Sequence, residues 1–287
     1  MRSGEDKEQE TPSRLKIGGM ALENGVLFQT ESHWAMALRR PDGEIEISSG
    51  GKLLPARLRN MKKIPLLRGL AGLAENAKVL PQAIARGGEV TALTRSPQML
   101  AAMLVSVVGT IIVRNPKKDL PPLMEETLVS ALALMPALVA VRKTRAIQYH
   151  AAEHKSINAY ELSGIVDESN IQTAGARHAR CGTNIIGPVL VLMTLGNTLA
   201  HRFLGRRRQV ARLGVSILSI SGAVELVQWA ARHPQSPWSK ILSLPGEELQ
   251  NLLTTAEPSA DQLEVSLAAL KELLRLEKAL PEQAGVA

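Results

Sequence analysis

The hydrophobic and polar positions of the N-terminal region alternate on both sides of a Pro41-Asp42-Gly43 turn. The alternating segments are residues 34–40 (WAMALRR) and 44–48 (EIEIS). Alternation with a period of two on either side of such a turn predicts an antiparallel β-hairpin. We therefore expect a small β-rich region over residues 17–60.

Four largely apolar stretches follow, and most of their ends are marked by arginine. They are residues 96–113, 127–141, 182–200 and 213–231. A membrane-spanning helix needs about 17–25 apolar residues. The first and third stretches are long enough, the second is short, and the fourth contains Glu225. The pattern predicts a mainly α-helical, multi-pass membrane protein with about four apolar helices, and a soluble bundle with buried helices is the alternative.

Two further segments have the spacing of amphipathic helices. Residues 63–86 are expected to be helical, with a break at Pro81. Near the C-terminus, Ser259 and Gln262 form a capping-box pattern. It precedes leucines on one helical face, at positions 263, 267, 270 and 274. The expected organisation is a disordered tail over 1–16, the β-rich region, a helical membrane domain over 61–258 with a motif loop at 142–182, and a C-terminal helix and tail over 259–287.

The charge of the chain suggests an anionic partner. The formal net charge is +7 and the isoelectric point is about 9.7. Aromatic residues make up only 2% of the chain, so stacking on nucleic-acid bases is not expected. We expect anionic lipid headgroups of a bilayer instead. No oligomeric state or substrate follows from the composition.

The expected location is the cell membrane, with the N-terminus in the cytoplasm. The first 16 residues mix both charges and lack the apolar segment of a signal peptide. With four spans, however, the arginine-rich loop over 201–212 would lie outside, against the positive-inside rule. The single cysteine, Cys181, excludes an intrachain disulfide.

The segment Tyr149 to Lys155 (YHAAEHK) carries the strongest chemical signal. On a helix, His150, Glu153 and His154 share one face. Two imidazoles one turn apart can hold a zinc-class ion, and the carboxylate can act as a ligand or as the base for a water molecule. The spacing matches the H-x-x-E-H pattern of inverted zinc peptidases. The alternative is a polar helix face with solvated histidines. Lys155 lies off this face and is expected to be solvated.

Further candidate ligands come from outside this helix. His178 and Cys181 are three residues apart in the segment HARCGT, although, taken alone, the pair is better explained by a buried cysteine beside a loop histidine. Glu225 lies within an apolar stretch, where an unpaired carboxylate is costly, so it should face a metal, a cavity or an arginine such as Arg212 or Arg232. Glu161 returns to the histidine face and is a further candidate.

Several of these segments together resemble the YqhQ-like family of bacterial proteins with a domain of unknown function. The strongest matching segments are YHAAEHK and HARCGT, with RRPDG at 39–43 and DQLEV at 261–265 in the same order. Glycine is usual in the family where Ala151 and Asn24 stand, and proline where Ala179 stands. The resemblance implies a multi-pass membrane protein and a metal-dependent enzyme with no assigned reaction.

The predicted function is therefore a divalent metal site, with zinc as the expected ion, at the cytoplasmic surface of the membrane. His150 and His154 are the expected ligands, Glu153 the catalytic base, and Glu225, His178 or Cys181 the third ligand. A metal-dependent hydrolase is the first interpretation. A membrane scaffold or envelope-assembly factor with structural histidine motifs is the second.

Overall fold

The N-terminal region forms one antiparallel sheet, as the alternating pattern predicts. The computed structural model describes residues 14–89, 97–115, 120–141, 145–204, 208–250 and 256–278, so most of the predicted N-terminal tail lies outside the described residues. The strands are consecutive in the sheet: β1 (Gly18–Ala21), β2 (Gly25–Gln29), β3 (His33–Arg39) and β4 (Ile45–Gly51). The predicted hairpin is β3–β4, with Arg39 opposite Ile45 and Gly43 at φ 92° in the turn.

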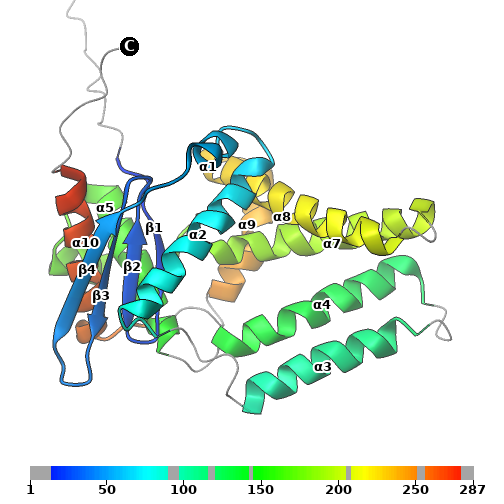
Figure 1. The fold of residues 1–287 in the computed structure, drawn as a ribbon, viewed down its shortest axis with the longest axis horizontal. Coiled ribbons are helices and arrows are strands. Elements are labelled where there is room, and N and C mark those ends of the chain that lie inside the picture. The colour runs from blue at the N-terminus through cyan, green and yellow to red at the C-terminus, as the bar shows by residue number, and fades with distance from the viewer. Residues whose placement is uncertain are drawn as a thin grey trace, which may run out of the picture.

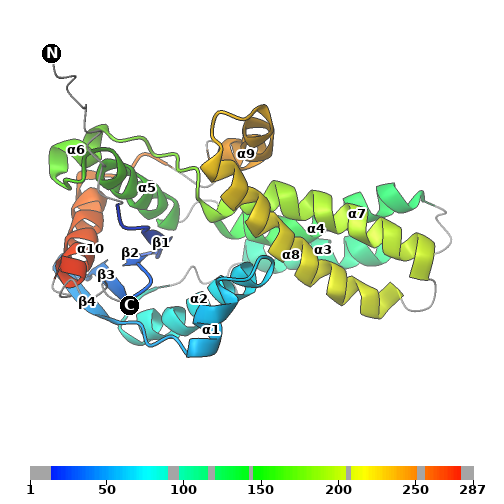
Figure 2. The same ribbon diagram turned by 90° about the horizontal axis from the view of Figure 1, so that it is seen from above.

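Both faces of the sheet are covered by helices because its central strands are apolar on both sides. Helix α2 (Leu67–Ala85) covers one face, and α5 (Ala146–Ser163) and α10 (Ala260–Lys278) cover the other (Figures 1 and 2). Alternate β2 residues point to opposite layers: Phe28 packs with the α5 and α10 side, and Leu27 with the α2 side. The candidate site on α5 is thus fixed to the main core.

Helix α2 does not break at Pro81, contrary to the prediction. It continues to Ala85 with this proline inside. Val79 and Ala83 are buried in the core against the sheet on either side of it. Packing of these flanking residues offsets the one hydrogen bond that a proline removes from a helix.

The four apolar stretches are all helical, and they form a bundle that extends away from the sheet (Figure 1). These helices are α3 (Pro97–Val113), α4 (Pro122–Val141), α7 (Ile186–Leu204) and α8 (Arg208–Arg232). Among the described residues, two segments are long and apolar enough to cross a membrane, Gly182–Phe203 and Ala211–Arg232. The structure thus supports two candidate spans rather than four among the described residues: α3 is a shorter apolar helix, and α4 is not one of the two spans.

The remaining elements complete the connections between the sheet and the bundle. They are α1 (Ala56–Met61), α6 (Glu168–Thr173), the 3-10 turn η2 (Gly182–Ile185) and α9 (Pro237–Leu249). The predicted capping box is confirmed on the Gln262 side, where the Ser259 backbone N–H donates to Gln262 Oε1 at 2.9 Å. Leu267 and Leu270 of the predicted leucine face are buried, with Leu263 and Leu274 packed against them.

Candidate metal centre

Helix α5 holds the YHAAEHK segment in a fixed rotation. Tyr149 and Ile157 are buried in the core beneath the sheet, and Ile157 lines the same cavity as His150 and His154, so core packing fixes the direction in which the two histidines point. The helix ends at Gly164, whose φ of 74° and N–H bond to the Tyr160 carbonyl terminate it in the left-handed conformation. The predicted helical spacing of the two histidines is therefore confirmed.

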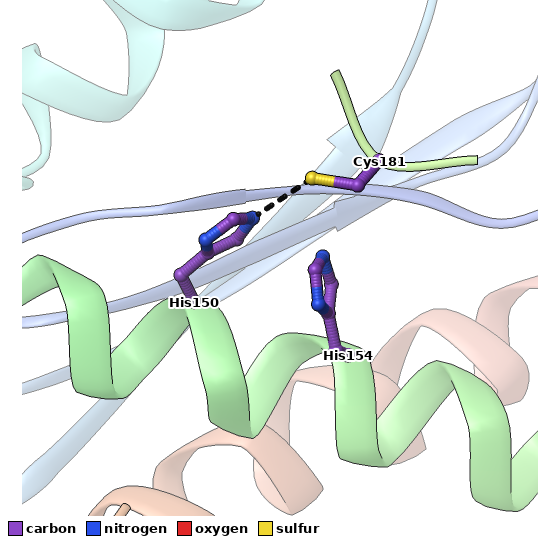
Figure 3. A group of neighbouring side chains, drawn as sticks. All are labelled: His150, His154 and Cys181. Atoms are coloured by element: carbon purple, nitrogen blue, oxygen red, sulfur yellow. Dashed lines mark hydrogen bonds between the residues drawn. The ribbon is translucent and has the colours of Figure 1, made fainter. Parts of the chain in front are cut away.

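Three side chains of the types that can bind a metal converge above α5 (Figure 3). The rings of His150 and His154 lie with their centroids 4.3 Å apart. Cys181 approaches from the loop before η2, with its Sγ 3.3 Å from His150 Nε2. One donor atom from each of these residues lies within 4.8 Å of the others. The structure thus brings together three of the predicted ligands from two separate motifs.

The ring of His154 is oriented by a backbone carbonyl. Its Nδ1 lies 2.7 Å from the Ala176 carbonyl oxygen, and a carbonyl can only accept, so Nδ1 carries the proton. In the neutral ring Nε2 then keeps its lone pair for a ligand. The Asn158 side-chain amide donates to the carbonyls of Gly175 and Arg177, both at 2.7 Å. This arrangement is typical of histidines that bind metals.

A buried amide network fixes the backbone that carries Cys181. Asn184 Nδ2 donates to the Ala179 carbonyl at 2.7 Å, and Gln250 Nε2 donates to Asn184 Oδ1 at 3.1 Å. Gln250 Oε1 accepts from the His178 backbone N–H at 3.1 Å. Gln250 and Asn184 are buried. The cysteine therefore sits on a segment tied to α9 as well as to α5.

Glu153 lines the same cavity, and its carboxyl group is buried beside the first strand. Burial raises the pKa of Glu153 to about 7, and the nearby His150 opposes part of that rise. A Cβ atom on Gly19 would lie 2.6 Å from Glu153 Cδ, so only glycine leaves room for this carboxyl group. The cavity has a volume of about 510 Å³. Its wall includes the predicted residues His150, Glu153, His154, His178 and Cys181.

The other predicted site residues are engaged elsewhere. His178 lines the cavity with its ring 5.8 Å from that of His154, but its Nε2 pairs with Glu161 at 3.3 Å. Glu161 also pairs with Arg180. Burial acts to raise the pKa of Glu161, but the hydrogen bond with His178 and the charge of Arg180 together lower it.

Glu225 is not brought to the histidines. Its Oε1 lies 2.7 Å from Arg68 Nε and accepts from the Leu66 backbone N–H. Glu225 therefore pairs with an arginine, as one of the alternatives predicted, but this arginine lies on α2 and is neither Arg212 nor Arg232.

Lys155 also differs from the prediction. It is buried, and its Nζ pairs with Glu257 at 2.9 Å and donates to the Gln172 carbonyl at 3.1 Å.

Sequence reasoning missed the residues that position the ligands. Asn158, one turn after His154, and Gln250, far along the chain, have no pattern that marks them as supporting residues. Thr183 gave a local signal, because it follows Cys181 by two residues, and its hydroxyl donates to the sulfur at 3.2 Å. Only the tertiary structure reveals the other two.

The donor set fits a zinc-class ion. Zinc prefers nitrogen and sulfur ligands at about 2.0–2.3 Å in a tetrahedral arrangement. Such bonds place donor atoms roughly 3.3–3.6 Å apart, so donors already within 4.8 Å of each other need only small side-chain rotations. Two neutral imidazoles and one thiolate also suit zinc better than calcium or magnesium, which take oxygen ligands.

A family model described as "Protein of unknown function (DUF1385)" matches residues 64–276. The chain belongs to this family. The DUF1385 match includes both histidine motifs and ends within α10. The "Uncharacterized protein YqhQ" of Bacillus subtilis (strain 168) is similar to the chain, with 30% identity over 307 aligned residues that cover 93% of this chain and 94% of that protein. No solved structure matches the chain.

Proposed function

We propose that this protein is a membrane-associated, metal-dependent hydrolase whose zinc-class ion is held by His150, His154 and Cys181. The observation that carries the proposal is the convergence of these three donors in one cavity, with the His154 tautomer set by the Ala176 carbonyl. Catalytic zinc sites use three protein ligands and keep one position open, whereas structural sites are closed by four. The donor group of three among the described residues favours the catalytic class over a scaffold.

Each residue at the cavity has a distinct role in this proposal. A bound divalent ion supplies Lewis acidity and lowers the pKa of water. Glu153 lies one turn of α5 from His150 and on the same cavity wall, where its carboxylate accepts the proton of an attacking water and returns it to the leaving group. Thr183 donates to the Cys181 sulfur and holds it toward His150.

Membrane association is supported by the surface of the helical bundle. Two of its helices have the length and composition of spans. The shorter helix α3 has many large apolar side chains exposed: Leu100, Met103, Leu104, Val105, Val107, Val108, Ile111 and Ile112. Contiguous exposed apolar area of this kind is typical of a membrane or protein interface. The sheet layer and the cavity would then lie at the bilayer surface, where the net charge of +7 favours anionic headgroups and a cytoplasmic face.

Metal content measured on the purified full chain tests the proposal. We expect about one zinc per chain, and loss of most of it in His154→Ala, His150→Ala and Cys181→Ser. His33→Ala is the matched control, because His33 lies on β3, pairs with Glu277 and does not line the metal-centre cavity. Equal zinc in all four variants would overturn the ligand assignment. Release of the protein from membranes by carbonate would contradict its integration.

A second candidate function uses Cys181 as a nucleophile. Its Sγ is 3.3 Å from His150 Nε2, and an imidazole at this distance can take the thiol proton. This alternative predicts a zinc-free protein in which Cys181 is alkylated by iodoacetamide much faster than a free thiol, and in which His150→Ala abolishes that reactivity. Zinc in the purified protein, with protection of Cys181 by the metal, would exclude it.

A further inference from the structure

The metal-centre cavity continues into two neighbouring cavities of different chemistry. The second cavity has a volume of about 440 Å³ and shares Gly18, Gln29 and Asn76 with the first. The third has a volume of about 370 Å³ and shares Asn76 with both. Because they share lining residues, the three cavities adjoin one another between the candidate metal centre and the helices α7 and α8, and we treat them as the parts of one cleft. We call it the three-part cleft.

The second part of the cleft is cationic. Its wall carries the basic side chains of Lys16, Lys52, Lys62 and Arg68 and the carboxylates of Glu31 and Glu75. Arg68 is already paired with Glu225, so the three lysines face the two carboxylates. Lys52 and Lys62 both pair with the single buried carboxylate of Glu75. One carboxylate cannot neutralise two ammonium groups, so this trio keeps a positive charge. An anionic group is the ligand that such a wall attracts.

The third part of the cleft is apolar and lies between α2, α4, α7 and α8. Its wall is formed mainly by aliphatic side chains: Leu73, Leu134, Ile185, Ile186, Val189, Ile220 and Val224. Helices α7 and α8 are the two candidate spans. If these helices span a bilayer, a lipid hydrocarbon chain could enter this part of the cleft directly from that bilayer.

Two observations at the junctions indicate that the cleft is open to a ligand. Gly72 lines both the cationic and the apolar part, and a Cβ atom on it would meet no other atom within 4 Å. Gln29 lines both the metal-centre and the cationic part. Its Oε1 is buried and accepts no hydrogen bond from any described residue. A hydroxyl group of a ligand would satisfy this acceptor.

We infer that the three-part cleft binds a single-chain anionic lipid. Its phosphate-class head lies at the lysine-lined wall, its chain lies between α2, α7 and α8, and the polar linkage between them lies toward Gln29 and the histidines. If the bound lipid is also the substrate of the hydrolase, that further step rests on the proposed function. The binding geometry itself depends on the cationic and apolar walls.

Three matched probes separate the contributions of the head and the chain. Lysophosphatidic acid carries both, monoacylglycerol keeps the chain without phosphate, and glycerol 3-phosphate keeps the phosphate without the chain. Native mass spectrometry of the full chain released from neutral detergent counts the bound probe. We expect one lysophosphatidic acid per chain. Glycerol 3-phosphate should bind at least about tenfold more weakly, because two buried methylenes alone account for such a factor. Monoacylglycerol should also bind more weakly, because it lacks the negative charge that the lysine-lined wall attracts.

Variants of the wall test the location of the lipid. Gly72→Leu fills the junction without a backbone clash and should weaken lysophosphatidic acid binding about tenfold or more. Lys16→Glu should weaken it about fivefold, in keeping with about 1 kcal/mol for an exposed ion pair. Lys78→Glu is the control, since Lys78 is exposed on the same helix as Gly72 but lies outside the cleft wall. Equal binding by all three variants would overturn the inference.

The lipid result and the metal result can fail separately. Lysophosphatidic acid binding should persist in chelator-treated protein and in His154→Ala, because neither changes the cationic or apolar wall. Loss of zinc with retained lipid binding would leave the lipid inference standing without the hydrolase. Retained zinc, with monoacylglycerol bound as tightly as lysophosphatidic acid or an apolar peptide displacing both, would reject the anionic lipid and leave the metal centre intact.

Discussion

The Glu153 carboxyl group occupies the space beside Gly19 that any other residue's Cβ atom would need. The two residues come from different layers, α5 and β1, and the Gly19 Cβ position lies 2.6 Å from Glu153 Cδ. We expect Gly19→Ala to displace the carboxyl group and lower the free energy of unfolding by about 1–3 kcal/mol, the usual effect of overpacking. Chemical denaturation monitored by circular dichroism measures this change.

Gly18→Ala is the control for this substitution. Its Cβ atom would meet only the Gln29 side chain, at an ordinary 3.9 Å. Its effect should therefore stay within about 0.5 kcal/mol. Equal destabilisation by the two variants would mean that the close approach of Glu153 to β1 is wrong.

Glu153 should also make the metal-free protein less stable as pH rises. Burial raises its pKa from 4.5 to about 7, so the folded state retains a proton that the unfolded state loses. The contribution is fully favourable below pH 4.5, declines up to about pH 7 and is then flat. Glu153→Gln removes this dependence. We expect its unfolding free energy, relative to the unsubstituted chain, to rise by up to roughly 3 kcal/mol between pH 5 and pH 8.

Denaturation of chelator-treated protein at several pH values checks this expectation. A difference between the two proteins that stays constant from pH 5 to pH 8 would contradict the burial of an ionisable carboxyl group at this position. Glu168→Gln, an exposed carboxyl on α6, should show no such trend.

Asn158 should control metal affinity without providing a donor. Its amide holds the carbonyls on either side of Ala176, whose oxygen orients His154. We expect Asn158→Ala to weaken zinc binding about 10–100-fold, the range for residues that orient a ligand. Competition with a chromogenic chelator measures the affinity. Asn170→Ala on α6, which removes a hydrogen bond to Asp167, should leave the zinc affinity unchanged.

One buried carboxylate links the α3–α4 pair of the bundle to α8. Glu126 on α4 pairs with Arg114 at 3.2 Å and with Arg212 of α8 at 3.1 Å, and its side chain is 2% exposed. We expect Glu126→Ala to lower the free energy of unfolding by about 1–3 kcal/mol, because two arginines, each about a quarter exposed, lose a buried partner. Thermal unfolding in detergent measures the loss. Glu125→Ala removes a more exposed carboxylate with one 3.4 Å contact and should cost less than 1 kcal/mol.

Local patterns predicted the local structure of this chain well. The Pro41-Asp42-Gly43 turn, the capping box at Ser259 and the helical spacing of His150 and His154 each depend on neighbouring residues, and each is confirmed. The Pro81 break was wrong because burial of Val79 and Ala83 in the core decides that helix. Burial cannot be read from a short segment alone.

Long-range partners were the main limit for the candidate site. Nothing in the sequence shows that Glu225 pairs with Arg68 rather than with an arginine of its own helix, since the two lie on different helices. The same holds for Gln250, which reaches His178 across 72 positions. Cys181 was one of several candidate third ligands, and its choice required the path of the loop before η2.

The last helix of the chain supports the donor-bearing helix from behind. Ser266 of α10 lies 2.6 Å, oxygen to oxygen, from Ser156 of α5, and donates to the Ala152 carbonyl at 3.1 Å. When synthesis has passed Cys181, all three proposed donors have been made, but α10, against which α5 packs, has not. A chain that stops before Ala260 would carry all three proposed ligands but lack the helix that packs behind α5.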